Sequence, residues 1–459
     1  FYASGAANLL TLRVKNGIMH LNLLNIEYRR NFDMNPLLPL DQFVPDGEAR
    51  QHADGRLYLY GSLDVPGDDS YCSCRYRVFS SDSLTHWTDH GVSFSTSDGA
   101  AGEFEGNRLY APDCVCKDGV YYLYFCLSNG REAVATSSSP AGPFSDPVAV
   151  IGADGDGIDP SVFIDDDGQA YYYWGQFSLC GARLKENMRE LDMSTVNRAL
   201  ITEQEHGFHE GASVRKHNGI YYLLYTDISR GGASCISYAM SRSPLGPFTK
   251  GGVVIDNTGC DPKNWNDHGC IAEFNGSWYV FYHRATNNSC FSRRACAEPI
   301  TFTADGRIPE VEMTTQGTQG PLSPLPVLEA GRACLLSGAA YIESRLEQGV
   351  YQEYLSHIQD GNWAAYKYFD FGQAAVSGFT MAAANGRFDS VYSARVELRL
   401  DSPDGTLIGT LDIPPTGGWT DWRDFSCPVQ PVQGRHALYL VFHGDLGRLC
   451  SVKEFHFIA

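Results

Sequence analysis

The sequence is poor in positive charge. Its 35 Lys and Arg residues stand against 54 Asp and Glu residues, which gives a formal net charge of −19 at pH 7. A nucleic-acid-binding protein gains affinity from Lys and Arg side chains that neutralise phosphates, and an anionic membrane surface attracts the same residues. The charge balance therefore argues against nucleic acid or a membrane as the partner and favours a neutral or cationic ligand.

Long apolar runs are also missing. No stretch approaches the roughly 18 apolar residues of a membrane-spanning helix, so no such helix is predicted. The apolar segment Leu21–Ile26 is interrupted by asparagine and is too short for a secretory signal. The chain begins at Phe1 rather than Met, which leaves a removed leader open. Residues 1–32 are interpreted as an N-terminal extension, which belongs either to the natural protein or to an added, non-native segment.

Cysteine is present, but its 14 positions show no metal-binding spacing. Cys72 and Cys74 are separated by one residue, as are Cys114 and Cys116, and neither pair matches the spacing of zinc ligands. We interpret the cysteines as scattered, mainly buried free thiols, which favours a reducing compartment. A cytoplasmic location is therefore preferred to secretion, which stays the alternative.

Aromatic residues and glycine, in contrast, are plentiful. Phe, Trp and Tyr make up 12% of the chain, with 26 Tyr, and there are 47 Gly. Aromatic residues favour β-strands, and glycine favours tight turns. The composition therefore predicts an all-β protein rich in hairpins.

A short phrase, Asp-Gly or Asn-Gly followed by an aromatic-rich strand, occurs five times. The copies are Asp54–Tyr60, Asp118–Tyr124, Asp167–Tyr173, Asn218–Leu224 and Asn275–Phe281. Such a dipeptide before alternating apolar residues is a strong hairpin signal. The copies are roughly 50 to 65 residues apart, a length that suits a four-stranded sheet. Five small sheets can bury their faces by radial packing, which predicts a five-bladed β-propeller; five hairpins in an ordinary sandwich are the alternative.

A second phrase marks the outer part of some repeats. It reads Ser139–Phe144 and Ser243–Phe248, and Ser83–Trp87 is its counterpart in the first repeat. We expect these segments to form the turn that leads into the outer strand of a blade.

Acidic residues recur at one offset before these turns. Asp46, Asp159 and Glu210 each lie nine residues before the glycine of their repeat, and His268 lies eight before its glycine. In the second repeat the nearest acid, Asp113, is only six residues away. Equivalent positions in successive blades begin the inner strands, so we expect the side chains to meet at one mouth of the central channel. Paired carboxylates in a pocket suit acid–base chemistry; shaping of an Asp-Pro or Pro-Asp turn is the alternative.

With these positions in place, the sequence resembles glycoside hydrolase family 43 over residues 35–325. The resemblance is carried by short motifs in a specific order: Val44–Gly47, Tyr110–Asp113, Gly157–Phe163, His209–Ala212, Asp267–Gly269 and Phe281–Arg284. Members of this family are five-bladed propellers. They hydrolyse β-xylosides, α-L-arabinofuranosides, arabinans or galactans with inversion at the anomeric carbon.

The resemblance implies a role for each acidic residue. Asp46 would be the general base that activates the attacking water, and Glu210 the general acid that protonates the leaving oxygen. Asp159, taken as ionised, would keep that acid protonated and hold it in place by like-charge repulsion and contact. Inversion needs two carboxyl groups roughly 6.5–9.5 Å apart, a gap that residues on opposite blades can span.

The resemblance also suggests ligand-binding residues around these three. His268 would lie on the channel axis near a bound calcium or a water cluster, so it is a candidate for both metal and substrate binding. Arg284 is expected to reach the pocket and bind sugar hydroxyls. Tyr110 is expected to flank the sugar, with packing as the alternative. No cofactor is required for the chemistry.

The last third of the chain has a different pattern. Alternating segments such as Val396–Asp401, Gly405–Ile413 and Ala437–Phe442 predict a β-sandwich. Residues 339–459 resemble a family 6 carbohydrate-binding module, a jelly-roll that stacks aromatic rings on sugars, with Trp419 and either Trp363 or Tyr366 as candidates. Ser451 and Lys453 replace the family's usual Asn and Asp, and Arg345 replaces a common Glu. These replacements indicate a lost calcium site and weakened or absent sugar binding, so the domain is expected to brace the propeller or edge its pocket, with sugar binding through Trp419 as the alternative.

Together these features predict an all-β chain with an extension (1–32), a five-bladed β-propeller (33–325), a linker (326–338) and a β-sandwich (339–459). The predicted function is an inverting, exo-acting glycosidase, a β-D-xylosidase or α-L-arabinofuranosidase acting on xylo- or arabino-oligosaccharides. An endo-arabinanase or galactanase on the same scaffold, and a non-catalytic sugar-binding propeller, are the alternatives.

Overall fold

The computed structural model describes residues 11–14, 17–20, 34–97, 104–153, 157–347, 350–372, 376–389 and 392–459. The chain divides into two compact units, Phe1–Asn31 and Phe32–Ala459. In the first unit, β1 (Thr11–Val14) and β2 (Gly17–His20) form an antiparallel pair. The remainder of the predicted extension 1–32 lies outside the described residues.

Five antiparallel sheets occupy residues 48–300, and each follows the chain from its first strand to its last. The strands, blade by blade, are β3 (Glu48–Gln51), β4 (Leu57–Tyr60), β5 (Arg75–Ser81) and β6 (Trp87–Ser95); β7 (Leu109–Lys117), β8 (Val120–Leu127), β9 (Glu132–Ser137) and β10 (Ser145–Ala149); β11 (Ser161–Ile164), β12 (Ala170–Trp174) and β13 (Cys180–Arg183); β14 (Phe208–His217), β15 (Ile220–Asp227), β16 (Cys235–Ser241) and β17 (Thr249–Asp256); and β18 (Cys270–Phe274), β19 (Ser277–Thr286) and β20 (Ser289–Ile300).

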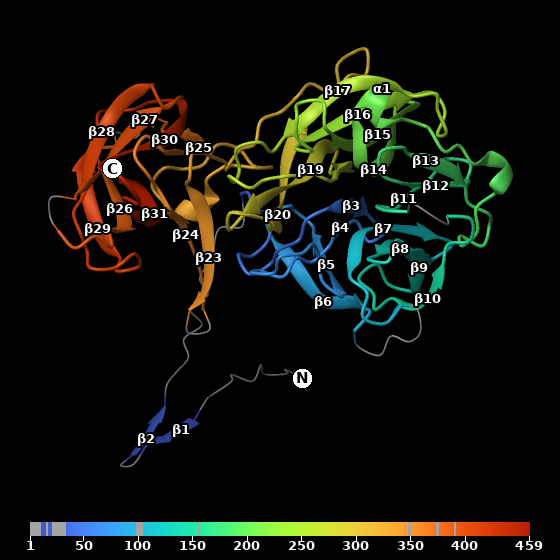
Figure 1. Ribbon diagram of the computed structural model, residues 1–459, viewed down its shortest axis with the longest axis horizontal. Helices are drawn as coiled ribbons and strands as arrows, with labels where there is room; N and C mark the ends of the chain where they lie inside the picture. The colour runs from blue at the N-terminus through green and yellow to red at the C-terminus, as the bar shows by residue number, and fades with distance from the viewer. Residues whose placement is uncertain are drawn as a thin grey trace, which may run out of the picture. The chain divides into compact units, whose positions relative to one another are not determined.

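The first strands of the five sheets close into a ring. β3 contacts β7, β7 contacts β11, β11 contacts β14, β14 contacts β18, and β18 contacts β3 again. The sheets radiate from this ring (Figure 1). The predicted five-bladed propeller is therefore confirmed, and each inner strand begins beside a central channel.

The repeated dipeptides form the turns between the first and second strands. In three of them the first residue lies in the left-handed region, with φ of 52° at Asp118 and 50° at both Asn218 and Asn275. Gly119 follows with a φ of 79°, so this turn has two positive φ angles, as in the type I′ turn of a tight hairpin. The aromatic strands that follow supply the buried layers between blades.

The second phrase also lies where the sequence predicts. Ser139–Phe144 joins β9 to β10, Ser243–Phe248 joins β16 to β17, and Ser83–Trp87 leads into β6. The expectation of four strands in every blade is wrong, because the third and fifth sheets have three. In the third blade, short bridges, η2 (Met193–Thr195) and α1 (Glu203–His206) follow the last strand.

The C-terminal domain is a sandwich of two antiparallel sheets, as predicted. One sheet has the order β23-β24-β31-β26-β29, with β21 also paired to β31, and the other has the order β22-β25-β30-β27-β28. The strands are β21 (Leu328–Glu329), β22 (Leu335–Leu336), β23 (Tyr341–Glu347), β24 (Val350–Ser356), β25 (Trp363–Asp370), β26 (Gly378–Ala384), β27 (Ala394–Leu400), β28 (Thr406–Ile413), β29 (Arg423–Pro428), β30 (Arg435–His443) and β31 (Ser451–Ile458).

The segment predicted as a linker, residues 326–338, is part of the sandwich. It contains β21, β22 and the short helix η3 (Ala330–Arg332), and both strands pair with sandwich strands. Leu328 and Leu336 are buried in the sandwich core. Their burial explains why this segment packs instead of spanning freely between domains.

The sequence predicts no membrane-spanning helix and mainly buried, free cysteines. None of the helices in the described residues is long and apolar enough to cross a membrane. All 14 cysteines are free, and ten of them are buried. This agrees with the interpretation of the cysteines as scattered, mainly buried free thiols.

Candidate active site

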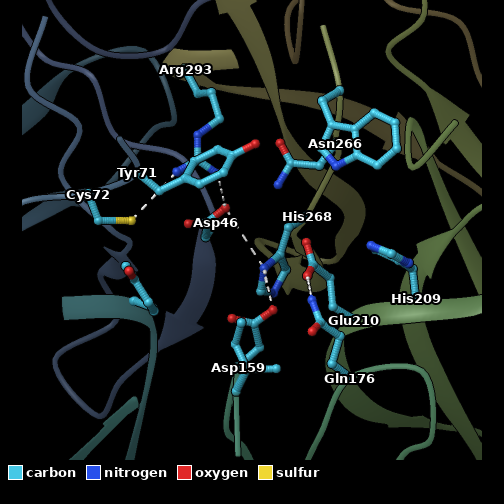
Figure 2. Close-up of a pocket in the computed structure, with 13 residues that line it drawn as sticks. Asp46, Tyr71, Cys72, Asp159, Gln176, His209, Glu210, Asn266, His268 and Arg293 are labelled. Carbon is cyan, nitrogen blue, oxygen red and sulfur yellow. Dashed lines mark hydrogen bonds and ion pairs between the residues drawn. The ribbon is translucent and has the colours of Figure 1, made fainter. Parts of the chain in front are cut away.

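The inward positions predicted from the repeat come together in space. Asp46, Asp159 and His268 precede the inner strands β3, β11 and β18, and Glu210 lies near the start of β14. All four line one pocket (Figure 2). Asp113 does not join them, because it is fully buried on β7 and accepts two hydrogen bonds from an arginine of β3. Asp113, which lies six rather than nine residues before its glycine, thus pairs with that arginine instead of facing the pocket.

The pocket is small and lined by polar and aromatic groups. Its volume is about 240 Å³, below the roughly 300–1,000 Å³ of pockets for drug-sized ligands. The lining residues are Asp46, Tyr71, Cys72, Tyr110, Ile158, Asp159, Gln176, His209, Glu210, Trp265, Asn266, His268 and Arg293. A cavity of this size has room for a single small ring rather than a chain of them.

Asp46 is held as an ionised carboxylate. Nη1 of Arg293 donates a 2.9 Å hydrogen bond to Asp46 Oδ1. Burial raises the pKa of Asp46, but the positive charge of Arg293 is the main opposing effect, and the net pKa lies below its ordinary value. The backbone of Asp46 has a φ of 58°, in the left-handed region that few non-glycine residues other than Asp and Asn occupy. An ionised, constrained carboxylate suits a group that accepts a proton.

His283 holds the backbone of Asp46 as a neutral ring. Its Nε2 lies 3.0 Å from the carbonyl oxygen of Asn266 and therefore carries the hydrogen. Its Nδ1 accepts the backbone N–H of Asp46 at 3.4 Å. Burial lowers the pKa of His283 to about 3, and the charge of Arg293 acts in the same direction. The 3.5 Å approach of Nδ1 to the carboxylate of Asp46 is therefore a contact with a neutral ring.

Arg293, on β20, lines the pocket but was not predicted from the sequence, and neither were Gln176 and Trp265. Its Nε and Nη2 donate to the two carboxylate oxygens of Asp64 at 2.9 Å, a fork-like pairing that fixes the guanidinium plane. Nη2 also approaches Sγ of Cys72 at 3.6 Å, and the guanidinium lies 4.7 Å from the ring centroid of Tyr71. These contacts aim the remaining Nη1 at Asp46.

The prediction that Arg284 reaches the pocket is wrong. Arg284 is buried on β19 and is not among the residues that line the cavity. Its guanidinium donates to the hydroxyl of Tyr282 and to the carbonyl oxygen of Thr314. Successive side chains of a strand point to opposite faces, and the neighbouring His283 already faces Asp46, so Arg284 points away from it.

Asp159 differs from Asp46 in its electrostatic surroundings. Burial raises the pKa of Asp159 well above its ordinary value, and the negative charges of Glu210, Asp46 and Glu132 raise it further. These surroundings favour the protonated form of Asp159, whereas the resemblance implied an ionised group. Its backbone φ of 53° is in the same left-handed region as that of Asp46.

Glu210 is placed by an irregularity in β14. The pairing of β14 with β15 shifts register on both sides of Glu210, a bulge of the kind that redirects a side chain. Gly211 follows with a φ of 70°, and a Cβ there would approach the ring of His268 to 3.0 Å. Nε2 of Gln176 donates a 2.8 Å hydrogen bond to Glu210 Oε2. One carboxylate oxygen is therefore held while the side chain faces the cavity.

His268 lies between the carboxylates (Figure 2). Its Nδ1 is 3.8 Å from Asp46 Oδ1 and 3.8 Å from Asp159 Oδ2. No group of three or more His, Cys, Asp or Glu side chains in the described ranges is arranged to hold a metal ion. Calcium prefers six to eight oxygen ligands, and Asp46 is already engaged by Arg293. These side chains do not form a calcium site by themselves.

Aromatic rings form the rim of the pocket. Tyr110 lines the cavity, as the resemblance predicted, and Trp265 joins it. Trp265 is 50% exposed and lies 6.4 Å from the ring of His209, which in turn lies 5.2 Å from the half-exposed ring of Phe177. Exposed aromatic rings beside a polar cavity provide apolar faces against which a flat ring can pack.

The aromatic candidates of the sandwich have other partners. Tyr366 is fully buried, and Trp363 packs edge-on against Tyr439. The ring of Trp419 is covered by the guanidinium of Arg448 at 4.4 Å and lies against Gly386, where a Cβ would come within 2.6 Å of it. Sugar binding through Trp419 stays a prediction, whereas Tyr366 belongs to the core.

Comparison with known proteins gives matches over both domains. The family described as glycosyl hydrolases family 43 matches residues 34–308, and carbohydrate binding module (family 6) matches residues 337–459. A xylosidase/arabinosidase of Thermoclostridium stercorarium is 30% identical, over 92% of this chain and 98% of its own length. An arabinoxylan arabinofuranohydrolase of Bacillus subtilis (strain 168) is 31% identical over 89% of each chain. The crystal structure of a family 43 arabinoxylan arabinofuranohydrolase from Bacillus subtilis, in complex with cellotetraose, has a TM-score of 0.52 and 28% identity, and it covers 92% of this chain and 97% of that one.

Proposed function

Since the chain belongs to glycosyl hydrolase family 43 and carries a C-terminal domain of carbohydrate-binding module family 6, we propose that it is an inverting, exo-acting glycosidase. Its proposed substrates are xylan or arabinoxylan fragments, from which it releases D-xylose or L-arabinose. The observation that carries this proposal is the convergence of Asp46, Asp159 and Glu210 on one pocket of about 240 Å³.

In the proposed reaction Asp46 is the general base. It accepts a proton from a water molecule, whose oxygen then bonds to the anomeric carbon as the glycosidic bond breaks. The ion pair with Arg293 supports this role, because a carboxylate must be ionised to accept a proton. The product sugar has the opposite anomeric configuration, since water attacks the face opposite the leaving group.

Glu210 is the proposed general acid that gives its proton to the leaving oxygen. Asp159 assists by its position beside Glu210, because the negative charges around this buried group favour retention of a proton within the pair. Glu210 is the more accessible of the two and lies near His209 at the rim. It is therefore the group placed to meet the leaving sugar.

The size of the pocket supports exo action on a pentose. A cavity of about 240 Å³ accommodates one sugar ring, and the aromatic rim leaves the next sugar outside. The names of the two similar proteins, a xylosidase/arabinosidase and an arabinoxylan arabinofuranohydrolase, support xylose or arabinose as the released unit. They do not choose between the two pentoses.

The proposal is tested with a panel of aryl β-xylosides, α-L-arabinofuranosides and β-galactosides. Wild-type protein should hydrolyse at least one pentoside, and NMR of the first product should give the inverted anomer. Asp46→Ala should lower kcat by about 10³-fold or more, by analogy with the loss of other reacting groups. Cleavage of internal arabinan bonds alone would indicate the endo-acting alternative, and no hydrolysis of any substrate would favour a non-catalytic sugar-binding propeller.

The role of Glu210 has its own test. Glu210→Ala should lose most activity on substrates with poor leaving groups, such as xylobiose, and little on an activated dinitrophenyl glycoside, which leaves without protonation. Glu186→Ala is the control, because the Glu186 side chain is 90% exposed and does not line the pocket. Equal losses of kcat/KM on both substrates would contradict the acid role.

A further inference from the structure

Two adjacent arginines on β20 connect the pocket to the sandwich. Arg293 faces the pocket and contacts Asp46, whereas Arg294 faces the sandwich and pairs with Glu353 of β24. This opposite direction follows from the alternation of side chains along a strand. In Figure 1 the hairpin of β23 and β24 lies on the side of the sandwich next to the fifth blade, and β23 contacts β19.

The pair of Arg294 and Glu353 is deeply buried. Nη2 of Arg294 lies 2.7 Å from Glu353 Oε1, and each side chain is 1% exposed. Nη2 also donates to Oγ of Ser344 on β23 at 2.9 Å. A buried pair breaks at a high cost when one partner is removed, because the other charge is left without compensation. The buried pair therefore attaches β20 of the propeller firmly to β24 of the sandwich.

A second contact reaches the segment that carries Asp46. The guanidinium of Arg294 lies 4.3 Å from the ring centroid of Phe43, and the ring of Tyr351 on β24 lies 6.0 Å from the same ring. The carbonyl oxygen of Phe43 accepts the backbone N–H of Asp64 at 2.9 Å. Asp64 is the residue that fixes the guanidinium plane of Arg293 in the pocket.

We propose that the hairpin of β23 and β24 is a positioning element for the general base: Glu353, through Arg294 and Phe43, holds Arg293 in register with Asp46. The inference rests on the proposed function, because it takes Asp46 as the base. It assigns the sandwich a part in catalysis that does not require the sandwich to bind sugar. Glu353 acts only through other residues and does not contact the substrate.

The test is the pH profile of kcat/KM for full-length Glu353→Gln and Tyr351→Leu. A loosened Arg293 no longer favours the ionised form of Asp46, so the acidic limb should move to higher pH. At a pH below the optimum, kcat/KM should fall about tenfold, mainly through kcat. The charged and titratable groups around Asp46 are Arg293 on β20, His283 on β19, Asp267 and His268 before β18, Asp64 after β4, Cys72 before β5, Tyr76 on β5 and Asp159 before β11.

Glu312→Gln is the matched control. Its carboxylate pairs with Lys367 and Tyr368 of the sandwich, away from β20. Glu353→Gln and Tyr351→Leu should shift the acidic limb, and Glu312→Gln should leave it in place. Variants that lose only thermal stability, with the limb unchanged, would overturn the inference while the wild type stays active. An inactive wild type would instead refute the proposed function. If Glu353→Gln fails to fold, the pH profile of Tyr351→Leu tests the inference, because this variant removes an aromatic ring and leaves every charge in place.

Discussion

Glu132, a buried carboxyl behind Asp159, should make the stability of the fold depend on pH. It begins β9, and its Oε2 accepts a 2.6 Å hydrogen bond from the hydroxyl of Tyr172. Its Oε1 has no hydrogen-bond partner among the described residues, and a Cβ at Gly157 would come within 2.7 Å of that atom. Burial raises the pKa of Glu132 from 4.5 to about 8, and the hydrogen bond from Tyr172 offsets only part of this effect.

The size and sign of the effect follow from proton linkage. Between pH 4.5 and about 8 the folded protein binds a proton at Glu132 that the unfolded chain has lost. The contribution is therefore fully present below pH 4.5 and is lost as the pH rises through about 8. At about 1.4 kcal/mol per pH unit, and with the unfolded chain still partly protonated at pH 5, the loss between pH 5 and pH 8 is about 3 to 4 kcal/mol. Glu132→Gln has no proton to lose, so its stability relative to wild type should improve by that amount across this range.

The assay is urea unfolding of wild type, Glu132→Gln and a control at pH 5, 6, 7 and 8. Glu186→Gln serves as the control, because the Glu186 side chain is 90% exposed. The informative quantity is the change with pH of the difference in unfolding free energy, since any fixed cost of the amide cancels. A difference between Glu132→Gln and wild type that varies by less than about 1 kcal/mol from pH 5 to pH 8 would refute the raised pKa of Glu132.

Three other changes have defined outcomes. Arg293→Lys should lower kcat/KM about 100-fold and move its acidic limb to higher pH, because a lysine cannot contact Asp64 and Asp46 together; an unchanged limb would contradict this. Trp265→Ala should raise KM for xylo-oligosaccharides about tenfold and leave KM for small aryl glycosides unchanged, and an equal rise for both would place its effect inside the pocket. EDTA should leave kcat unchanged, because His268 and its neighbours do not form a calcium site, whereas a loss restored by calcium would show that the channel holds the ion.

The sequence predicted the carboxylates well because they repeat. Asp46, Asp159 and Glu210 share one offset from a turn that recurs in each blade, and a repeated offset becomes a shared position once the inner strands form a ring. The same logic excludes Asp113, whose offset differs and whose side chain binds the core of the propeller instead.

Arg293 escaped prediction because it belongs to no repeat. It lies in the middle of β20, and its contact with Asp46 closes the ring between the last blade and the first, across more than 240 residues. Arg284 was chosen instead because it follows the fifth hairpin, but proximity to a turn does not tell which face of a strand a side chain occupies. Two adjacent arginines within a buried strand were the available signal, since buried cations require partners.

The start of the sandwich domain could not be predicted from the sequence pattern either. Proline and glycine before residue 326 indicate irregular backbone, but the end of that irregular stretch depends on tertiary pairing. Leu328 pairs with Phe455 of β31, beyond the short pairing of that strand with β24, and Leu336 pairs with Ala364 of β25. Short strands of two residues carry no periodicity of their own, so composition alone favours a linker.

Geometry assigns different roles to two acids that the sequence treats alike. Asp46 and Asp159 have the same offset, similar left-handed backbones and the same distance to His268, so none of these features separates a base from a proton-retaining group. The difference is the cation: the fifth blade supplies Arg293 beside Asp46, while Asp159 faces Glu210 and Glu132. The pocket thus combines a carboxylate held ionised with a neighbour of Glu210 whose surroundings favour its protonated form, and acid–base catalysis at one pH requires such opposite surroundings. Arg293 creates this difference, because it extends from the fifth blade to Asp46 of the first, where the ring of blades closes.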